Sequence, residues 1–233
     1  LGLGDINARG QQPNEMGDNL PAVDLGTGRS AIQVEAGRVH TCARLDNGQV
    51  KCWGSNFSGQ LGRGDNTGNN SAIGDQPNEM GDNLPAINFG TGQISFGLAA
   101  QSITLGSDHT CVRFRLNLPI ATPSGVKCWG ENFSGESGNG NNTGNLGNLG
   151  DHPNEMGNDL PAVDLGSDAN GAFSVMEVVA GGFHNCARLS NGRIKCWGRN
   201  STSNDIGGQL GLGDTNNRGD QPNEMGNLLP FVD

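Results

Sequence analysis

Short runs of alternating apolar and polar residues, separated by turn signals, are the dominant pattern along this chain. Its first quarter holds four such runs, at residues 20–25, 31–36, 40–45 and 49–53. An alternation with a period of two places successive side chains on opposite faces of a sheet, so each run predicts a strand. The last two runs flank a three-residue loop, 46–48, that ends in glycine and is typical of a β-hairpin. No apolar stretch approaches the roughly 20 residues of a membrane helix.

The predicted strands recur with a period of about 70 residues, and a repeat of this kind is one structural unit. Lys-Cys-Trp-Gly occurs three times, each copy preceded by Gly-x-x-His-x-Cys, and Pro-Asn-Glu-Met-Gly occurs four times. The pattern divides the chain into units at about 1–60, 61–136, 137–209 and 210–233, the last of them truncated. Both ends fall inside a repeat, so we expect the chain to be a portion of a longer array.

Composition supports many short elements joined by tight turns. Among the 233 residues, 40 are glycine and 10 are proline, while 33% are hydrophobic. Glycine, asparagine and aspartate tolerate the backbone conformations that tight turns require. The net charge is −10 and the Lys and Arg residues are scattered. Because phosphate binding requires clustered cations, this charge pattern argues against a general affinity for nucleic acid.

Six cysteines fall into three pairs across the predicted hairpins: Cys42 with Cys52, Cys111 with Cys128, and Cys186 with Cys196. In the first and third pairs a three-residue loop sets the two cysteines directly opposite each other, near the separation that a disulfide needs. The middle pair aligns in the same way if the extra residues of an enlarged tip, 115–124, loop out. The pattern favours disulfides and an oxidising compartment, with reduced buried cysteines as the alternative. Zinc ligation fits poorly, since the cysteines are not clustered as in a zinc knuckle.

The run at residues 37–62 contains Gly-x-x-His, a turn, and Trp-Gly-x-Asn-x-x-Gly-Gln-Leu-Gly. It resembles the repeat of the regulator of chromosome condensation family, and the resemblance recurs in the next two units. There the Gln-Leu-Gly end is replaced by Glu136-Ser137-Gly138 or displaced to Gln209-Leu210-Gly211. The resemblance implies an all-β fold, a β-propeller with one four-stranded antiparallel blade per repeat. Family propellers usually have seven blades, so about three and a third units imply a partial or open propeller.

Histidines and tryptophans also repeat with the units. Equivalent positions hold His40, His109 and His184, and a second set holds Trp53, Trp129 and Trp197. We expect each histidine to hydrogen-bond a neighbouring turn, the alternative being a metal site around the propeller axis. We expect each tryptophan to pack between blades, the alternative being stacking against a carbohydrate.

Polar loops supply the remaining candidate sites. Asp65 and Asp214 lie in loops with oxygen ligands suited to calcium, although these loops lack the spacing of the helix–loop–helix calcium site and also fit ordinary turns. Five Asn-x-Ser/Thr acceptors are candidates for glycosylation in a secreted eukaryotic protein: Asn56, Asn132, Asn200, Asn69 and Asn141. The first three share one repeat position, just after Trp-Gly.

The sequence contains no cluster of nucleophile, base and orienting residue, and His152 stands outside the repeated positions. We therefore predict a non-catalytic protein that requires no cofactor. The paired cysteines and long spacers resemble a subgroup of extracellular proteins with extended repeats. They imply a binding or assembly module of a secreted or surface protein.

We expect this module to contact a protein partner or neighbouring subunits through its long spacers, at 61–80 and 137–157, and through the tip at 115–124. Two alternatives remain at this stage. One is nucleotide exchange on a small GTPase, the activity of the family's best-known member, and the other is a calcium- or carbohydrate-binding propeller.

Overall fold

The computed structural model describes residues 1–65, 72–90, 98–116, 124–140, 147–201 and 207–232. The first sheet contains β1 (Ala31–Ala36), β2 (His40–Leu45), β3 (Val50–Ser55) and β4 (Ala72–Ile73). The second contains β5 (Leu98–Leu105), β6 (His109–Leu116) and β7 (Gly125–Gly130), and the third contains β10 (Val175–Ala180), β11 (His184–Leu189) and β12 (Ile194–Gly198). A small hairpin, β8 (Ser167–Asp168) and β9 (Gly171–Ala172), precedes the third sheet, and 3-10 turns lie at Gly17–Asn19, Gly81–Asn83 and Gly226–Leu228. Across these ranges there is no helix long and apolar enough to cross a membrane.

Each main sheet is built on the predicted hairpin. In the first sheet the Leu45 N–H donates to the Gln49 carbonyl at 2.8 Å, and Gly48 takes the positive φ of 79° that closes the three-residue turn. The third sheet has the same turn between β11 and β12. In the second sheet the pairing of β6 and β7 continues to Phe114 and Gly125, and residues 117–123 of the enlarged tip lie outside the described ranges.

The predicted fourth strand is present only in the first sheet, where it is very short. β4 pairs with β3 over two residue pairs, and in the other two sheets a single bridge takes its place. These bridges join Gly130 to Leu149 and Gly198 to Arg218. At the bridged glycine of each third strand a side chain would collide with the Gly-x-x-His loop, as with the Asp108 carbonyl at Gly130.

The run at 20–25, predicted as a strand, is extended without strand pairing. Its copy at 84–89 shows how such a run is held, because the Ile87 N–H donates one hydrogen bond to the Val50 carbonyl at 2.8 Å. Every copy of the run has proline at its second position, for example Pro21. Proline removes a backbone donor, so the run contacts the sheet edge at one point and forms no ladder.

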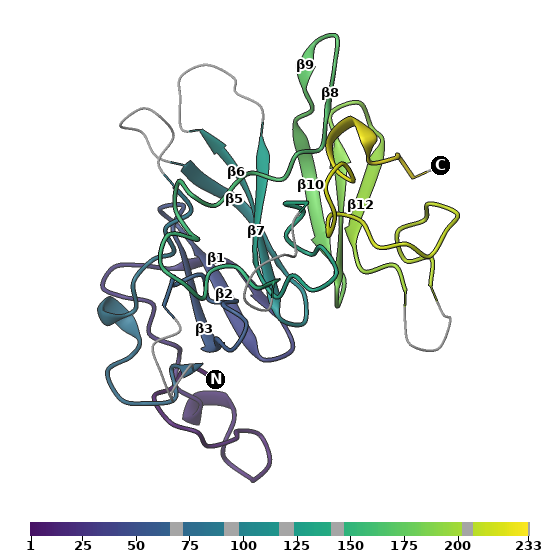
Figure 1. Cartoon of the computed structure of the whole chain (residues 1–233). Helices are drawn as coiled ribbons and strands as arrows, with labels where there is room; N and C mark the ends of the chain where they lie inside the picture. The colour runs from purple at the N-terminus through teal and green to yellow at the C-terminus, as the bar shows by residue number, and fades with distance from the viewer. Residues whose placement is uncertain (66–71, 91–97, 117–123, 141–146, 202–206, 233) are drawn as a thin grey trace.

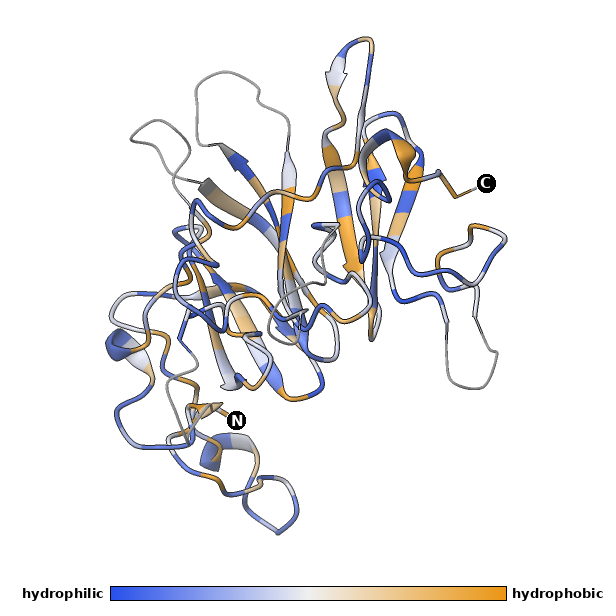
Figure 2. Cartoon of the chain, in the orientation of Figure 1, coloured by the Kyte–Doolittle hydropathy of each residue, from blue (hydrophilic) through white to orange (hydrophobic). Residues whose placement is uncertain are grey.

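The three main sheets stack face to face, with the second sheet between the first and the third (Figure 1). β5 contacts β1 and β2 on one side and β10 on the other. Two clusters of buried apolar residues fill the two junctions between sheets. Figure 2 shows hydrophobic stretches along the strands, most clearly in β10, where Val175 and Val178 are buried while Met176 and Val179 are exposed. Burial of apolar surface between neighbouring sheets is therefore what holds the stack together.

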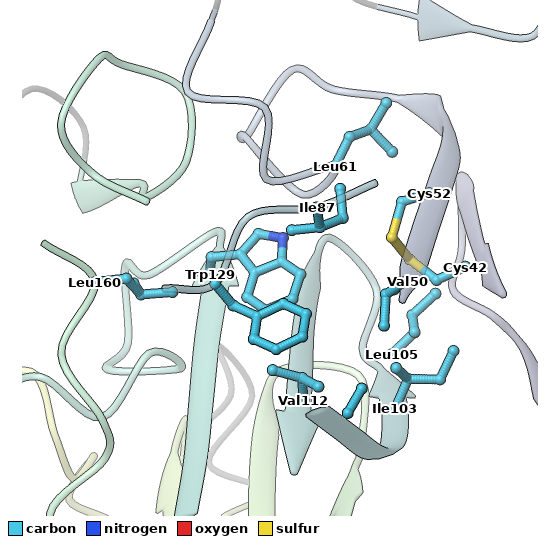
Figure 3. Packing of buried hydrophobic residues seen from close by; sticks show 12 residues of the cluster. Cys42, Val50, Cys52, Leu61, Ile87, Ile103, Leu105, Val112, Trp129 and Leu160 are labelled. Atoms are coloured by element: carbon cyan, nitrogen blue, oxygen red, sulfur yellow. A yellow bond between two sulfur atoms is a disulfide. The ribbon is translucent and has the colours of Figure 1, made fainter. Parts of the chain in front are cut away.

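The first junction packs a disulfide of one sheet near the indole of the next (Figure 3). Cys42 and Cys52 come from β2 and β3, while Trp129 comes from β7 and is fully buried. Val112 and Ile103 of the second sheet complete the contact. Truncating a fully buried Trp to Ala typically costs roughly 3–5 kcal/mol, so each junction is a major contribution to stability.

Candidate functional site

The three predicted disulfides are present: Cys42–Cys52, Cys111–Cys128 and Cys186–Cys196. In each pair the cysteines are directly opposed in the strand register, with Cα atoms 4.1 Å apart. No cysteine of the chain is free. The register of the second sheet sets Cys111 opposite Cys128 and continues to Phe114 and Gly125.

Two of the repeated histidines form hydrogen bonds across the junctions. His40 Nε2 lies 2.9 Å from Thr110 Oγ1 in the second sheet, and His109 Nε2 lies 3.0 Å from Asn185 Oδ1 in the third. The Thr110 hydroxyl donates its own proton to the Gln60 carbonyl at 2.9 Å, so His40 must donate through Nε2. Burial lowers the pKa of both histidines to about 4. Both rings are therefore neutral donors that connect adjacent sheets, a longer reach than the neighbouring turn that we expected.

The repeated tryptophans close the same junctions. Trp129 Nε1 donates to the Gln60 carbonyl at 3.0 Å, and Trp197 Nε1 donates to the Glu136 carbonyl at 3.1 Å. Both indoles are fully buried, and Trp53 is only 5% exposed. Packing between sheets is confirmed for Trp129 and Trp197. Carbohydrate stacking is the wrong interpretation for all three, because none has a ring face open to a ligand.

The chain's three lysines are buried, and no role for them was predicted from the sequence. Lys127 Nζ donates to the carbonyl oxygens of Phe89 and Gly157, at 2.8 and 2.9 Å. Lys51 and Lys195 donate to spacer carbonyls in the same way. Each lysine therefore ties the third strand of its sheet to the glycine that ends a Pro-Asn-Glu-Met-Gly segment. One sequence signal indicates these contacts: a lysine precedes Cys-Trp-Gly in every copy, within a run whose tryptophan is expected to pack between blades.

The Pro-Asn-Glu-Met-Gly segments form closed loops around their own glutamates. Oε2 of Glu155 accepts the backbone N–H groups of residues 150, 151 and 152, at 2.9, 3.2 and 2.9 Å. Glu79 and Glu224 make the same three contacts. The asparagine before each glutamate has a left-handed backbone, with φ between 65° and 68° in all four copies. The motif is therefore a structural loop, and one oxygen of its glutamate is already occupied.

Three glycosylation candidates prove to be buried. Asn56, Asn132 and Asn200 are at most 3% exposed, and each accepts a backbone N–H through Oδ1 at 2.8 to 3.0 Å. Each Nδ2 also donates a hydrogen bond within its own loop. A glycan on Nδ2 would break these bonds and fill a closed space, so glycosylation at these three positions does not fit the folded chain. Asn69 and Asn141 lie outside the described residues.

The two calcium candidates are paired with arginines. Arg63 Nη2 lies 3.1 Å from Asp65 Oδ2, and Arg218 Nη2 lies 2.6 Å from Asp214 Oδ2. The Asn216 N–H also donates to Asp214 Oδ1, and this bond, followed by Arg218, lowers the pKa of the Asp214 carboxyl. In each loop a guanidinium group therefore already pairs with one of the carboxylate oxygens that a calcium ion would use.

The copies differ at one end of the sheets, where the Gly-x-x-His loops meet the ends of the third strands. Backbone bonds join these loops from sheet to sheet: the Arg38 N–H donates to the Ser107 carbonyl at 3.3 Å, and the Ser107 N–H donates to the Gly182 carbonyl at 2.8 Å. The variable residues, which we call the variable end, are Arg38, Val39, Ser55, Ser107, Asp108, Glu131, Gly182, Phe183 and Arg199.

Charged and aromatic side chains are close together at the variable end. Arg38 Nη2 lies 2.6 Å from Asp108 Oδ2, and the Arg38 side chain remains 63% exposed. Burial, and then the Asp108 carboxylate, raise the pKa of Glu131, while Arg38 and Arg199 oppose the shift. The Arg199 guanidinium lies 5.4 Å from the centroid of the Phe183 ring. A mixed surface of carboxylates, guanidinium groups and an aromatic ring therefore lies on a scaffold of backbone bonds.

Grooves recur beside the spacers. One groove of about 540 Å³ is lined by residues from segments 62–65, 85–88 and 153–159. A second of about 570 Å³ has the same place one unit earlier, between residues of segments 2–4, 21–24 and 76–83. The spacers at 61–80 and 137–157 thus contribute to shaped surfaces in their described parts. Residues 66–71 and 141–146 of these spacers lie outside the description.

Stacked antiparallel sheets with the same hydrogen bonds at each junction define the class of this protein, an arc of a β-propeller. A family model described as the regulator of chromosome condensation (RCC1) repeat matches residues 31–60 and 177–203. These matches cover the hairpin and Trp-Gly segments on which the junctions depend. In these two segments the chain is therefore similar to RCC1-type repeats.

Particular relatives agree with this class. The chain is similar to the ultraviolet-B receptor UVR8 of Arabidopsis thaliana, with 27% identity over 187 residues, 80% of this chain and 32% of that protein. It also resembles human WBSCR16 (TM-score 0.57, 18% identity, 92% of this chain and 43% of that one). Yeast RCC1 (Prp20), in its structure bound to Kap60, gives a TM-score of 0.54 at 14% identity, with 87% of this chain and 37% of that one covered. The structural likenesses show the fold, and the chain spans about a third of the length of the curated relative.

Proposed function

We propose that this chain is a non-catalytic protein-binding or assembly module of a secreted or surface protein. The observation that carries the proposal is that the repeated residues stabilise the fold, while several residues that vary between copies are exposed. The repeated Cys, His, Trp and Lys residues are consumed in holding the stack together. At the variable end, residues that differ between copies place charged and aromatic groups in reach of solvent. A scaffold of constant parts that presents a non-repeating surface is suited to recognition.

The contact surface combines the variable end with the grooves beside the spacers. Aromatic and arginine side chains are enriched among the residues that dominate binding energy at protein interfaces, and Phe183, Arg38 and Arg199 are of these types. The partner is another protein or a neighbouring subunit of an assembly. Yeast RCC1 is bound to a protein, Kap60, in its crystal structure, which is consistent with this use of the fold.

Three disulfides support an oxidising compartment, since cross-strand disulfides of this kind persist outside the reducing cytosol. We therefore place the protein outside the cell or at its surface. Nucleotide exchange on a cytosolic GTPase fits this compartment less well, and the likeness to yeast RCC1 extends to the fold alone. Non-reducing mass spectrometry of the native protein distinguishes these alternatives. Six free thiols would remove the support for an extracellular module.

A photo-crosslinking experiment tests the contact surface. A photoreactive residue replaces Phe183 at the variable end or Asn191 at the opposite end of the same strand pair, where the hairpin turns. Each protein is exposed to the native extracellular fluid or cell surface. We expect a discrete crosslinked protein from position 183 and none from position 191. Equal crosslinking at both positions, or none at either, would contradict recognition through the variable end.

A further inference from the structure

One Pro-Asn-Glu-Met-Gly loop has a histidine, a common metal ligand, where the other three have glutamine. The residue before the proline is Gln12, Gln76 and Gln221 in three copies, and His152 in the fourth. Three loops close without a histidine, so the loop framework does not require one. The imidazole has no part in the junctions, in the lysine contacts or at the variable end.

The loop framework places three ligand atoms next to one another. Three backbone N–H groups hold Oε2 of Glu155, so its Oε1 faces other partners. Asp151 Oδ1 lies 2.9 Å from His152 Nδ1, and the same nitrogen lies 4.0 Å from Glu155 Oε1. All three ligand atoms lie within 4.8 Å of one another.

These separations suit one shared ion. Tetrahedral zinc has ligands at roughly 2.0–2.1 Å, which places neighbouring ligand atoms ~3.3 Å apart. That value falls between the two separations made by the His152 nitrogen, so a small rotation of the imidazole accommodates the ion. One nitrogen with two carboxylate oxygens favours a transition metal over calcium or magnesium, which prefer oxygen ligands throughout.

The three side chains differ in their exposure to solvent. The Asp151 side chain is 5% exposed, Glu155 is 25% exposed and His152 is 47% exposed. An ion held here keeps a coordination position open to water, as zinc sites with three protein ligands do. The corresponding aspartate of an unmodified loop, Asp75, keeps a buried Oδ1 without a hydrogen-bond partner. A buried oxygen without a partner is costly. In the fourth loop the same oxygen of Asp151 is paired with His152 Nδ1 at 2.9 Å, and an ion bound between the two side chains would replace this hydrogen bond.

We propose that Asp151, His152 and Glu155 form a binding site for one divalent transition-metal ion of the zinc type. The ion neutralises two adjacent carboxylates and cross-links the first and last parts of the loop. The same loop lines the groove of about 540 Å³ through neighbouring residues such as Pro153 and Met156. Metal binding therefore stiffens one wall of this groove. In the equivalent loops the corresponding wall is held by hydrogen bonds alone.

Calorimetric titration of the whole, untagged chain with Zn²⁺ in a non-chelating buffer near pH 7.5 tests the site. We expect one equivalent to bind. His152→Gln introduces the residue of the other three loops, so the loop closes normally, and the affinity for Zn²⁺ should fall at least tenfold. Unchanged affinity in this variant, or no Zn²⁺ binding by the native chain at about 1 mM, would overturn the proposal.

Gln221→His is the matched gain-of-site variant. Asp220 and Glu224 occupy the places of Asp151 and Glu155, and Glu224 makes the same three backbone contacts. We expect this variant to bind two equivalents of Zn²⁺, and the double variant His152→Gln/Gln221→His to bind one. A variant that stays folded by circular dichroism and gains no second equivalent refutes the geometric basis of the site.

Discussion

Replacement of Lys127 by methionine tests how strongly the spacer is tied to its sheet. The ammonium group donates to the carbonyls of Phe89 and Gly157, and both bonds are buried. Methionine keeps most of the apolar stem and removes the donor, so two buried carbonyl oxygens lose a partner, at about 1–3 kcal/mol each. Burial lowers the pKa of Lys127, which shows that the charged form already carries a desolvation cost that the variant avoids. The expected net loss is about 2–4 kcal/mol in the free energy of unfolding.

Urea unfolding at neutral pH, followed by tryptophan fluorescence, measures the effect. Arg188→Met is the matched control, because Arg188 pairs with Glu177 on the exposed face of the third sheet. An exposed ion pair contributes at most about 1 kcal/mol, so this control should change little. If Lys127→Met destabilises the chain by less than the control does, the two buried bonds do not hold the spacer and the reasoning is refuted.

Three further predictions follow from buried groups. Glu136→Gln should stabilise the chain by about 3 kcal/mol at pH 8 and by little near pH 4.5. Burial raises the pKa of Glu136 to about 7, so the stability that its protonated form contributes is lost as pH rises through that value. An equal gain at both pH values would contradict this. In the Glu136→Gln background, the urea midpoint should fall as pH is lowered from 6.5 to 4. His40 and His109 have a pKa of about 4 in the folded chain, so only the unfolded chain takes up protons at these residues over this range. A flat profile would show that these histidines are accessible. Cys111→Ala/Cys128→Ala should cost about 3 kcal/mol by the chain-entropy estimate, measured by thermal unfolding without reductant, and an unchanged Tm would argue against the disulfide.

The repeat made much of this fold predictable. A glycine-terminated turn fixes the hairpin register, and that register alone predicts that Cys42 lies opposite Cys52, as it does. The same local reasoning failed for the run at 20–25, whose alternation resembles a strand. Its proline removes a backbone donor, and its contacts come from a lysine and a glycine distant in sequence, Lys51 and Gly81. A periodic pattern predicts which side chains face the core, but it does not predict which backbone groups form hydrogen bonds with a neighbouring strand.

The candidate sites were predicted less well, because their chemistry depends on burial. Asn56 satisfies a glycosylation pattern, yet it lies inside a loop with both ends of its amide bonded. Asp65 has the residue type of a calcium ligand, but Arg63 is already its partner. Conversely, the sequence indicates no role for Lys127, whose ammonium group forms two buried hydrogen bonds. Each error has the same origin, since residue type alone does not tell whether a polar group faces water or another part of the protein.

The buried lysines have a consequence for the chemistry of the protein surface. Since all three side-chain amines point inward, the exposed cations of the side chains are guanidinium groups, apart from any protonated histidine. Amine-reactive reagents, and enzymes that acylate lysine or attach ubiquitin to it, find no side-chain target on the folded chain. Labelling of these lysines therefore reports opening of the spacers. In a crude mixture, the rate of such labelling would follow the local unfolding of each unit separately.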